Sequence, residues 1–314
     1  MTLPVAALTG ASGFLGRRLA YLLRQDSWRV RVLVRRPLDM KLWDGSPPEL
    51  VEGHLADQAS LERLTSDVDL AIHCAGAVSA RNRAAYFAAN ADGAGNMARA
   101  MAATSSARMV LVSSLAAREP QLSSYAASKE AGELAARAAL APERLVVVRP
   151  PAIYGPGDRA TVDVFKLAAK SPFLPVLDAP AARMALAHVD DVAAEILRLA
   201  RAPDAPALAA IGGARPQGYG WREIMTAAAR AVGREPRLVA VPPGLVTGAA
   251  HVSGLLGKIT NRPLVFSPGK AREMLHGDWS VSSRELAPGA LPAHFTLDEG
   301  FADTVAWYRA KAWL

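Results

Sequence analysis

The chain has 314 residues, 51% of them hydrophobic and 21% charged, a composition that excludes a disordered or collagen-like polypeptide. Because Cys74 is the single cysteine, an internal disulfide and a thiolate metal cage are both excluded, and we expect a cytoplasmic protein. The 36 Lys and Arg against 29 Asp and Glu give a net charge of +7. This charge is spread along the chain with acids interleaved, which favours an anionic small-molecule ligand over nucleic acid.

The N-terminal residues Met1 to Leu8 are apolar but carry no basic segment, so we expect a strand there and not a cleavable signal. No stretch of about 18 uninterrupted apolar residues predicts a membrane span. Histidine, cysteine and acidic residues show no metal-ligand spacing, and we expect no metal site.

The first half of the chain alternates short apolar runs with helical stretches. Strands are expected at Val5–Leu8, Arg29–Val34, Glu49–Glu52, Leu70–His73, Met109–Ser113 and Leu145–Val148. Helices are expected over about Gly13–Gln25, Asn82–Ala103 and Tyr125–Leu140. This alternation predicts an α/β fold with a Rossmann-type, doubly wound parallel sheet of six or seven strands.

Beyond Pro150 the pattern loosens, and most of the 22 prolines lie in this part of the chain. Helices are expected near Thr161–Lys170, Asp190–Arg201, Trp221–Val232 and Leu297–Lys311, joined by long loops. We assign residues 1–160, with the elements around 183–212, to a cofactor-binding Rossmann domain. Residues 161–182 and 213–314 are assigned to a smaller, mostly helical substrate-binding region.

Three glycines at a spacing of three follow the first strand and open the first helix. In this context the backbone can approach a pyrophosphate closely, and the helix N-terminus offers free N–H groups and partial positive charge. A plain glycine-rich turn is the alternative. The segment predicts dinucleotide binding through Gly10, Ser12, Gly13, Phe14, Leu15 and Gly16.

The end of the second strand carries Arg35 and Arg36, and no carboxylate follows before Asp39. An acid at this point would bind the ribose hydroxyls of NAD, whereas guanidinium groups suit the 2′-phosphate of NADP. We therefore expect NADP, with NAD as the alternative if both arginines are only solvated loop residues.

Tyr125 and Lys129 stand four residues apart, on one face of a predicted helix. A nearby ammonium favours the phenolate of a tyrosine, whose ordinary pKa of about 10 makes it a poor base at neutral pH. Ser114 ends the strand before this helix, and ligands of open α/β sheets bind beyond the carboxyl ends of strands. We expect the hydroxyl of Ser114 and the Tyr/Lys pair to meet at one site.

With these motifs the chain resembles the extended short-chain dehydrogenases/reductases, whose members include sugar-nucleotide epimerases, dihydroflavonol reductases and 3β-hydroxysteroid dehydrogenases. Nearly the whole length takes part in the resemblance. Further matching segments are Ile72 to Gly76, Asn90 to Asn96, Arg149 to Asp158 and His188 to Val192.

The resemblance implies that Tyr125 is the acid/base at the substrate oxygen, that Lys129 lowers its pKa and holds the nicotinamide ribose, and that Ser114 orients the substrate. Ser113 is the alternative to Ser114. It also implies a small-molecule substrate and a possible homodimer. An integral membrane segment is not expected, because the sequence has no apolar stretch long enough. Cofactor contacts implied in the same way are those of Tyr125, Lys129, Leu55, Ala75, Gly76, Pro150 and Ile153. His54 departs from the family, which usually has an aspartate there.

The substrate class follows from departures within the family. Ala152 stands where many nucleotide-sugar enzymes have an asparagine, and no Tyr-Gly pair follows Ser114. We therefore expect an NADP-dependent oxidoreductase that interconverts a ketone or aldehyde and an alcohol on a small or hydrophobic substrate. A nucleotide-sugar epimerase or dehydratase with tightly bound NAD is one alternative, and a non-catalytic NADP-binding subunit is another.

The segment from Leu245 to Leu256 is apolar at helical spacing, which is typical of a core helix. The resemblance to hydroxysteroid dehydrogenases offers a second interpretation, a helix that helps receive a hydrophobic substrate. A third is contact with a membrane surface, since Lys258 and Arg262 flank the segment.

Overall fold

The computed structural model describes residues 2–36, 47–260 and 266–314, and within 255–260 it describes the backbone alone. The flanking residue Arg262 and the side chain of Lys258 therefore lie outside the described residues, as does Asp39. The chain divides into two compact units, Met1–Arg149 with Ala193–Ala209, and Pro150–Val192 with Ala210–Leu314. This division does not test what each unit binds. That the first region binds the cofactor and the second the substrate stays a prediction.

The first unit contains a seven-stranded sheet with the order β11-β6-β5-β4-β1-β2-β3. The pairings from β6 through β1 to β3 are all parallel, with Ala7 of β1 opposite Arg31 on one side and Ala71 on the other. The predicted doubly wound α/β fold is confirmed. Its strands are β1 (Val5–Thr9), β2 (Arg29–Val34), β3 (Glu49–Glu52), β4 (Leu70–His73), β5 (Arg108–Val112), β6 (Leu145–Arg149) and β11 (Leu208–Ala210).

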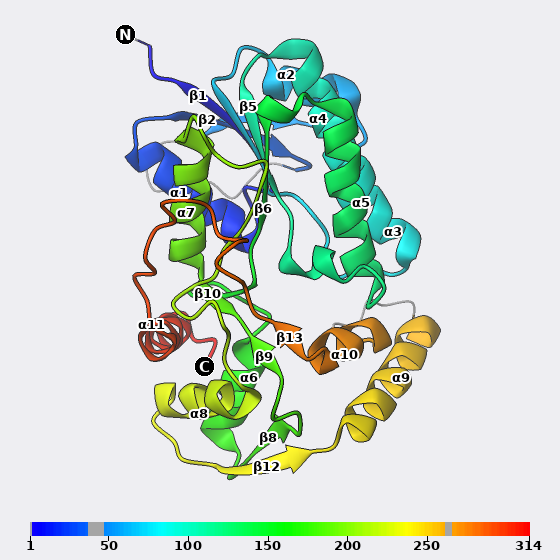
Figure 1. Cartoon of the computed structure of the whole chain (residues 1–314), viewed down its shortest axis with the longest axis vertical. Coiled ribbons are helices and arrows are strands. Elements are labelled where there is room, and N and C mark those ends of the chain that lie inside the picture. The colour runs from blue at the N-terminus through cyan, green and yellow to red at the C-terminus, as the bar shows by residue number, and fades with distance from the viewer. Residues whose placement is uncertain (1, 37–46, 261–265) are drawn as a thin grey trace. The chain divides into compact units, whose positions relative to one another are not determined.

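Helices cover both faces of this sheet, with α1 and α7 on one side and α4 and α5 on the other (Figure 1). Residues of β1 and β6 are buried almost without a break, which is why these strands are continuous apolar runs in the sequence. The helices are α1 (Phe14–Gln25), α2 (Gln58–Thr65), α3 (Arg83–Phe87), α4 (Gly93–Thr104), α5 (Ser124–Ala139) and α7 (Val189–Arg201), with short 3-10 turns at Leu115–Arg118 and Pro142–Arg144.

A core cluster lies between the sheet and the helices α2, α4 and α5. Fully buried methionines from α4 and β5 meet leucines from α2 in it, and each such side chain contributes about 1.5–3 kcal/mol through its removal from water. Its largest members are Leu61, Leu64, Met97, Met101 and Met109.

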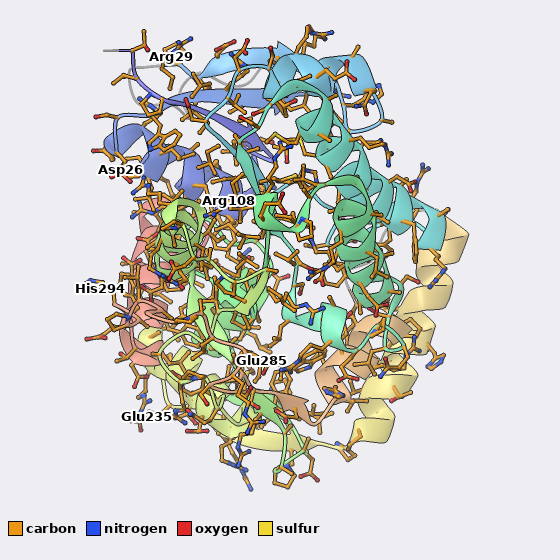
Figure 2. The ribbon with its side chains drawn as sticks, turned by 45° about the horizontal axis from the view of Figure 1, so that its top comes forward. Asp26, Arg29, Arg108, Glu235, Glu285 and His294 are labelled. Atoms are coloured by element: carbon orange, nitrogen blue, oxygen red, sulfur yellow. The ribbon has the colours of Figure 1, made fainter. Side chains whose placement is uncertain are left out.

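The segment 202–209 returns to the sheet after the chain has passed through the second unit. Arg108, labelled in Figure 2, donates hydrogen bonds to the carbonyl oxygens of Ala202 and Pro203. Val147 of β6 donates its N–H to the carbonyl oxygen of Ala207 at 3.1 Å. These contacts explain why a late segment of the chain belongs to the first unit.

The helix expected over Asn82–Ala103 is divided in the structure. The chain forms α3, then a π-helical turn at Ala88–Asp92, and then α4. Asn90 lies buried in this turn, and a Cβ added at Gly132 of α5 would lie 2.3 Å from its carbonyl oxygen. The close approach of α5 to the turn therefore requires glycine at position 132.

The second unit has an aromatic core formed by Tyr154, Phe165, Phe301 and Tyr308 in edge-to-face contact. Three two-stranded parallel pairs, β10 with β7, β12 with β8 and β13 with β9, add to the helices expected there. The elements are β7 (Ala152–Tyr154), α6 (Val162–Lys170), β8 (Phe173–Leu177), β9 (Arg183–Met184), β10 (Leu186–His188), α8 (Trp221–Ala231), β12 (Arg237–Val241), α9 (Pro243–Thr260), α10 (Pro268–Leu275), β13 (Asp278–Trp279) and α11 (Leu297–Ala310).

Helix α9 contains the apolar segment that was expected to be a core helix. Leu245 is 66% exposed and Val252 is 62% exposed, while Ala250 is buried. The core interpretation is wrong for this part of the segment, because α9 packs against α10 and presents these apolar side chains to solvent. Among the described residues, no helix combines the length and the apolar character that crossing a bilayer requires.

Candidate functional site

The strand order places a possible ligand site at the carboxyl ends of β1 and β4. From β1 the chain builds the sheet outward to β2 and β3 on one side and to β4, β5 and β6 on the other. Loops that leave neighbouring parallel strands in opposite directions open a crevice at such a reversal. The glycine turn after β1 and the segment 74–76 after β4 both lie at this point of the sheet.

The glycine turn is packed too closely for side chains at two of its positions. Gly10 has a left-handed backbone with φ +76°, and a Cβ there would lie 2.7 Å from the backbone nitrogen of Ala75. A Cβ on Gly16 would lie 2.0 Å from the carbonyl oxygen of Gly10. Gly13 donates its N–H to that same oxygen at 2.9 Å. Close packing against the segment after β4, and between the turn and the start of α1, therefore requires glycine at both positions.

Helix α1 begins at Phe14, and Gly13 precedes it with an extended backbone. Ser12 and Gly13 are exposed, and Phe14 is half-buried. Leu15 is buried, so its side chain belongs to the core and a ligand can meet only its backbone. The first N–H groups of a helix have no partner within the helix, which makes this end suited to phosphate oxygens.

A buried hydrogen-bond chain connects β1 with β4 beneath the glycine turn. The hydroxyl of Thr9 accepts the N–H of Ala75 at 3.2 Å and lies 2.9 Å from Nδ1 of His73. Burial lowers the pKa of His73 to about 3, and the charge of Lys129 acts in the same direction. His73 is therefore neutral and structural, and it holds the start of the Ala75-Gly76 segment.

The two arginines after β2 are exposed, and neither makes a hydrogen bond or an ion pair with another described residue. Leu55, which follows β3, is half-buried against the core cluster, and its carbonyl oxygen accepts a hydrogen bond from Asn96 at 2.7 Å. Arg35 and Arg36 are thus available to an anion at the end of β2, whereas Leu55 is fixed by the protein itself.

Helix α5 carries the Tyr/Lys pair and is capped by Ser123, whose hydroxyl accepts the N–H of Ala126 at 2.9 Å. The ammonium of Lys129 donates to the carbonyl oxygen of Val112 at 2.7 Å. Burial lowers the pKa of Lys129 to about 8, and the neighbouring Cys74 and Glu133 oppose that shift. The structure therefore brings the ammonium of Lys129 to Val112, the last residue of β5, which stands two residues before Ser114 in the sequence.

The two serines after β5 differ in what their hydroxyls do. Ser113 is buried, and its hydroxyl donates to the carboxylate of Glu133. Ser114 is half-buried, and its hydroxyl accepts the N–H of Ala116 at 3.2 Å as the cap of a 3-10 turn that packs against α5. A hydroxyl that only accepts from the protein keeps its proton available for a ligand oxygen, which distinguishes Ser114 from Ser113.

Gly76 lies close to both Asn90 and Lys129. A Cβ at this position would lie 2.8 Å from Oδ1 of Asn90 and 3.8 Å from Nζ of Lys129. Asn90 in turn exchanges hydrogen bonds with the backbone of Ala77 and donates to the hydroxyl of Ser128 at 2.8 Å. The first unit thus gathers the glycine turn, Gly76 and Lys129 at one edge of its sheet.

Pro150 and Ile153 belong to the second unit. Pro150 directly follows the last residue of β6, and Ile153 lies in β7 opposite Ala187 of β10.

In the described part of the chain, His, Cys, Asp and Glu side chains nowhere form a group that could hold a metal ion.

A sequence model of the NAD dependent epimerase/dehydratase family matches residues 6–211, a range that spans the whole sheet as far as β11. The chain belongs to this family. The resemblance to extended short-chain dehydrogenases/reductases is confirmed, and the protein is an NAD(P)-dependent enzyme of the dehydrogenase/reductase type.

Three relatives illustrate the family. The ceramide reductase of Caulobacter vibrioides (strain NA1000 / CB15N) is 49% identical over 311 residues, which are 99% of this chain and 96% of the relative. The crystal structure of gox2253 aligns with a TM-score of 0.76 at 21% identity over 100% of both chains. The Bordetella bronchiseptica enzyme WbmH in complex with NAD+ aligns with a TM-score of 0.72 at 20% identity, over 98% of this chain and 99% of that chain. At these identities the two structures support the fold alone.

Two side chains of the site did not emerge as candidates from the sequence. Asn90 was part of a matching segment, but its contacts to Ala77 and Ser128 depend on the π-helical turn. Glu133 stands four residues after Lys129 and eight after Tyr125, so helical spacing alone places it on the same face. That spacing was the signal that could have identified it.

Proposed function

We propose that the protein is an NADP-dependent oxidoreductase that interconverts a ketone and an alcohol on a ceramide-class lipid, with Tyr125 as the acid/base. The observation that carries this proposal is the 49% identity, over almost the whole chain, to a ceramide reductase. A ceramide is an N-acylated long-chain amino alcohol with a secondary hydroxyl beside the amide-bearing carbon. The corresponding ketone differs from it by one hydride and one proton, which is the difference that this enzyme type makes.

The residues present fit a bound dinucleotide. The exposed turn residues Ser12 and Gly13 and the N-terminus of α1 would receive the pyrophosphate, and Arg35 and Arg36 would bind the 2′-phosphate. When bound, the nicotinamide supplies or accepts the hydride. We assign the cofactor to the first unit on these grounds.

The chain's own residues would manage the proton and orient the substrate. Tyr125 would donate its phenolic proton to the carbonyl oxygen as the alcohol forms, and would take it back in the reverse direction. Ser114 would hydrogen-bond the same oxygen, since its hydroxyl proton has no acceptor in the protein among the described contacts. Lys129 would keep a positive charge next to the phenol through its position on the same helix face.

Exposed apolar side chains in the second unit support a lipid substrate. Leu245 and Val252 on α9 and Phe173 and Val239 on the β8–β12 pair are all at least 43% exposed. Leu245 and Val252 stand seven residues apart and therefore share one face of α9, and an exposed apolar helix face can meet another apolar body. Ala152, in place of the asparagine common in nucleotide-sugar enzymes, agrees with this substrate class.

The test is turnover of the ketone analogue of a ceramide in detergent micelles, with NADPH and NADH supplied in parallel. We expect NADPH oxidation that depends on the lipid, and a product that mass spectrometry finds heavier by two hydrogen atoms. Co-purified NAD(H) at one equivalent, with turnover of a nucleotide sugar and none of the lipid, would support the epimerase or dehydratase alternative. NADPH binding without turnover of either substrate would support the non-catalytic alternative.

A further inference from the structure

Helix α5 contains a third functional position, Glu133, one turn beyond Lys129. Its side chain is buried, with the residue 3% exposed. The guanidinium of Arg149 donates two hydrogen bonds to its carboxylate, at 2.8 and 2.7 Å, and the hydroxyl of Ser113 donates a third. A buried carboxylate with three donors is fully satisfied, so this side chain has one defined position.

These contacts connect α5 to the carboxyl ends of two neighbouring strands. Ser113 directly follows β5 and precedes Ser114, and Arg149 is the last residue of β6. Lys129 makes the corresponding contact one helical turn earlier, to the carbonyl oxygen of Val112. The face of α5 that carries Tyr125, Lys129 and Glu133 is therefore fixed against the strand ends at two successive turns.

Glu133 also contributes to the electrostatic environment of Lys129. Two groups face this ammonium from β4 and the segment after it, namely His73 at the end of the strand and Cys74. Burial keeps both neutral, with pKa values of about 3 and about 12. On α5 itself the neighbours are Tyr125 and Glu133. Glu133 is thus the carboxylate that opposes the loss of the Lys129 proton, and Arg149 partly balances its charge.

We propose that Glu133 is a positioning residue of the Ser114, Tyr125 and Lys129 site, which holds the catalytic face of α5 against β5 and β6 and favours the ammonium form of Lys129. The role in turnover rests on the proposed function. The role toward Lys129 does not, because the proton on this lysine can be measured without any substrate.

The direct test is a titration of Lys129 in the cofactor-free protein, by competitive acetylation over a pH series with peptide mass spectrometry. In Glu133→Gln we expect the pKa of Lys129 to fall by about half to one unit, because one nearby negative charge is lost. Glu195→Gln is the matched control, since Glu195 is also buried, with 5% exposure, and also pairs in a bidentate manner with an arginine, Arg198. An unchanged Lys129 titration in Glu133→Gln, or an equal shift in Glu195→Gln, overturns the electrostatic part of the proposal.

Arg149→Met provides a second measurement with the opposite sign. Removal of the arginine leaves the charge of Glu133 unbalanced, so the pKa of Lys129 should rise. Opposite shifts from the two halves of one ion pair cannot arise from general loosening of the helix. Shifts of the same sign contradict the proposal.

Measurements of turnover distinguish the effect of the Glu133 charge from the effect of its position. Glu133→Asp keeps the charge but shortens the side chain, so Lys129 should titrate as in the wild type while kcat falls about 10-fold and KM changes little. NADPH affinity, followed by fluorescence, reports whether each variant is folded. Wild-type kcat in Glu133→Asp would overturn the positioning role. A wild-type protein that never turns over the lipid would instead contradict the proposed function and leave the Lys129 titration as an independent test.

Discussion

The ammonium of Lys129 donates a hydrogen bond to the carbonyl oxygen of Val112 at 2.7 Å, so a lysine of α5 reaches the end of β5. The same lysine is largely removed from water, and this burial lowers its pKa to about 8 from an ordinary value of 10.5. Below about pH 8 this buried cation therefore makes an unfavourable contribution to the free energy of folding.

The first prediction concerns the stability of Lys129→Met. Between about pH 8 and pH 10.5 the unfolded chain binds a proton at this lysine and the folded chain does not, so the free energy of unfolding of the wild type rises with pH across this window. The variant lacks this dependence. We expect it to be more stable than the wild type at pH 7 by about 1–3 kcal/mol, with the difference shrinking toward pH 10.

Urea unfolding of both proteins over this pH range measures the difference, and lipid-dependent NADPH oxidation should be lost in the variant. A difference in unfolding free energy that stays constant from pH 7 to pH 10 would contradict the buried ammonium.

The second prediction concerns the phenolic proton of Tyr125. Tyr125→Phe keeps the ring, which packs edge-on against Tyr86 with centroids 6.2 Å apart, but removes the hydroxyl. General acid/base catalysis contributes about 10²–10⁴-fold, so kcat should fall by that factor while the affinity for NADPH stays within about 2-fold. Steady-state kinetics and a fluorescence titration measure the two quantities.

Tyr86→Phe is the matched control, because it removes the hydroxyl from the other ring of the same aromatic pair and leaves the edge-on contact in place. It should retain activity within a few-fold. Comparable losses in the two variants would show that the aromatic contact, and not the Tyr125 hydroxyl, supports turnover.

The sheet could be predicted from the sequence because its central strands are buried on both faces and are therefore continuous apolar runs, as at Leu145–Val148. The glycine turn was equally visible, since collisions at Gly10 and Gly16 restrict those positions to glycine. Such features depend on local sequence and leave a local signal.

Other parts of the structure left no such signal. The strands Arg183–Met184 and Asp278–Trp279 are two residues long, which is too short for any periodicity. The partnership of Glu133 with Arg149 joins residues 16 apart in the sequence and exists only once β6 lies beside β5. Side-chain networks of this kind require the tertiary fold.

The third prediction concerns the choice between NADPH and NADH. Arg35 and Arg36 lie exposed at the end of β2 with no partner among the described residues, and a 2′-phosphate would gain charge-assisted hydrogen bonds from them. Replacement of both by alanine should weaken NADPH binding about 10–100-fold and leave NADH binding nearly unchanged.

Fluorescence titrations with the two cofactors, at low and high salt, measure this effect. Arg29→Ala is the control, because Arg29 is an exposed arginine at the opposite end of the same strand. If the affinities for NADPH and NADH fall by the same factor in the double variant, these arginines do not bind the 2′-phosphate.

The fourth prediction separates two reasons for glycine in the turn after β1. Gly10 and Gly233 have the same left-handed backbone, with φ +76°. A Cβ at Gly10 would lie 2.7 Å from the backbone nitrogen of Ala75, whereas a Cβ at Gly233 meets nothing within 4 Å. Alanine at either position meets the left-handed strain of about 1–2 kcal/mol, but only Gly10→Ala adds a collision with backbone.

We therefore expect Gly233→Ala to lower the free energy of unfolding by about 1 kcal/mol and to bind NADPH normally. Gly10→Ala should be destabilised further and should lose NADPH affinity by about 10-fold or more, because the turn and the Ala75-Gly76 segment must move apart. Denaturant unfolding and cofactor titration of the two variants give the comparison. Equal behaviour of both would mean that backbone strain alone, and not the close approach of β1 and β4 loops, requires glycine at position 10.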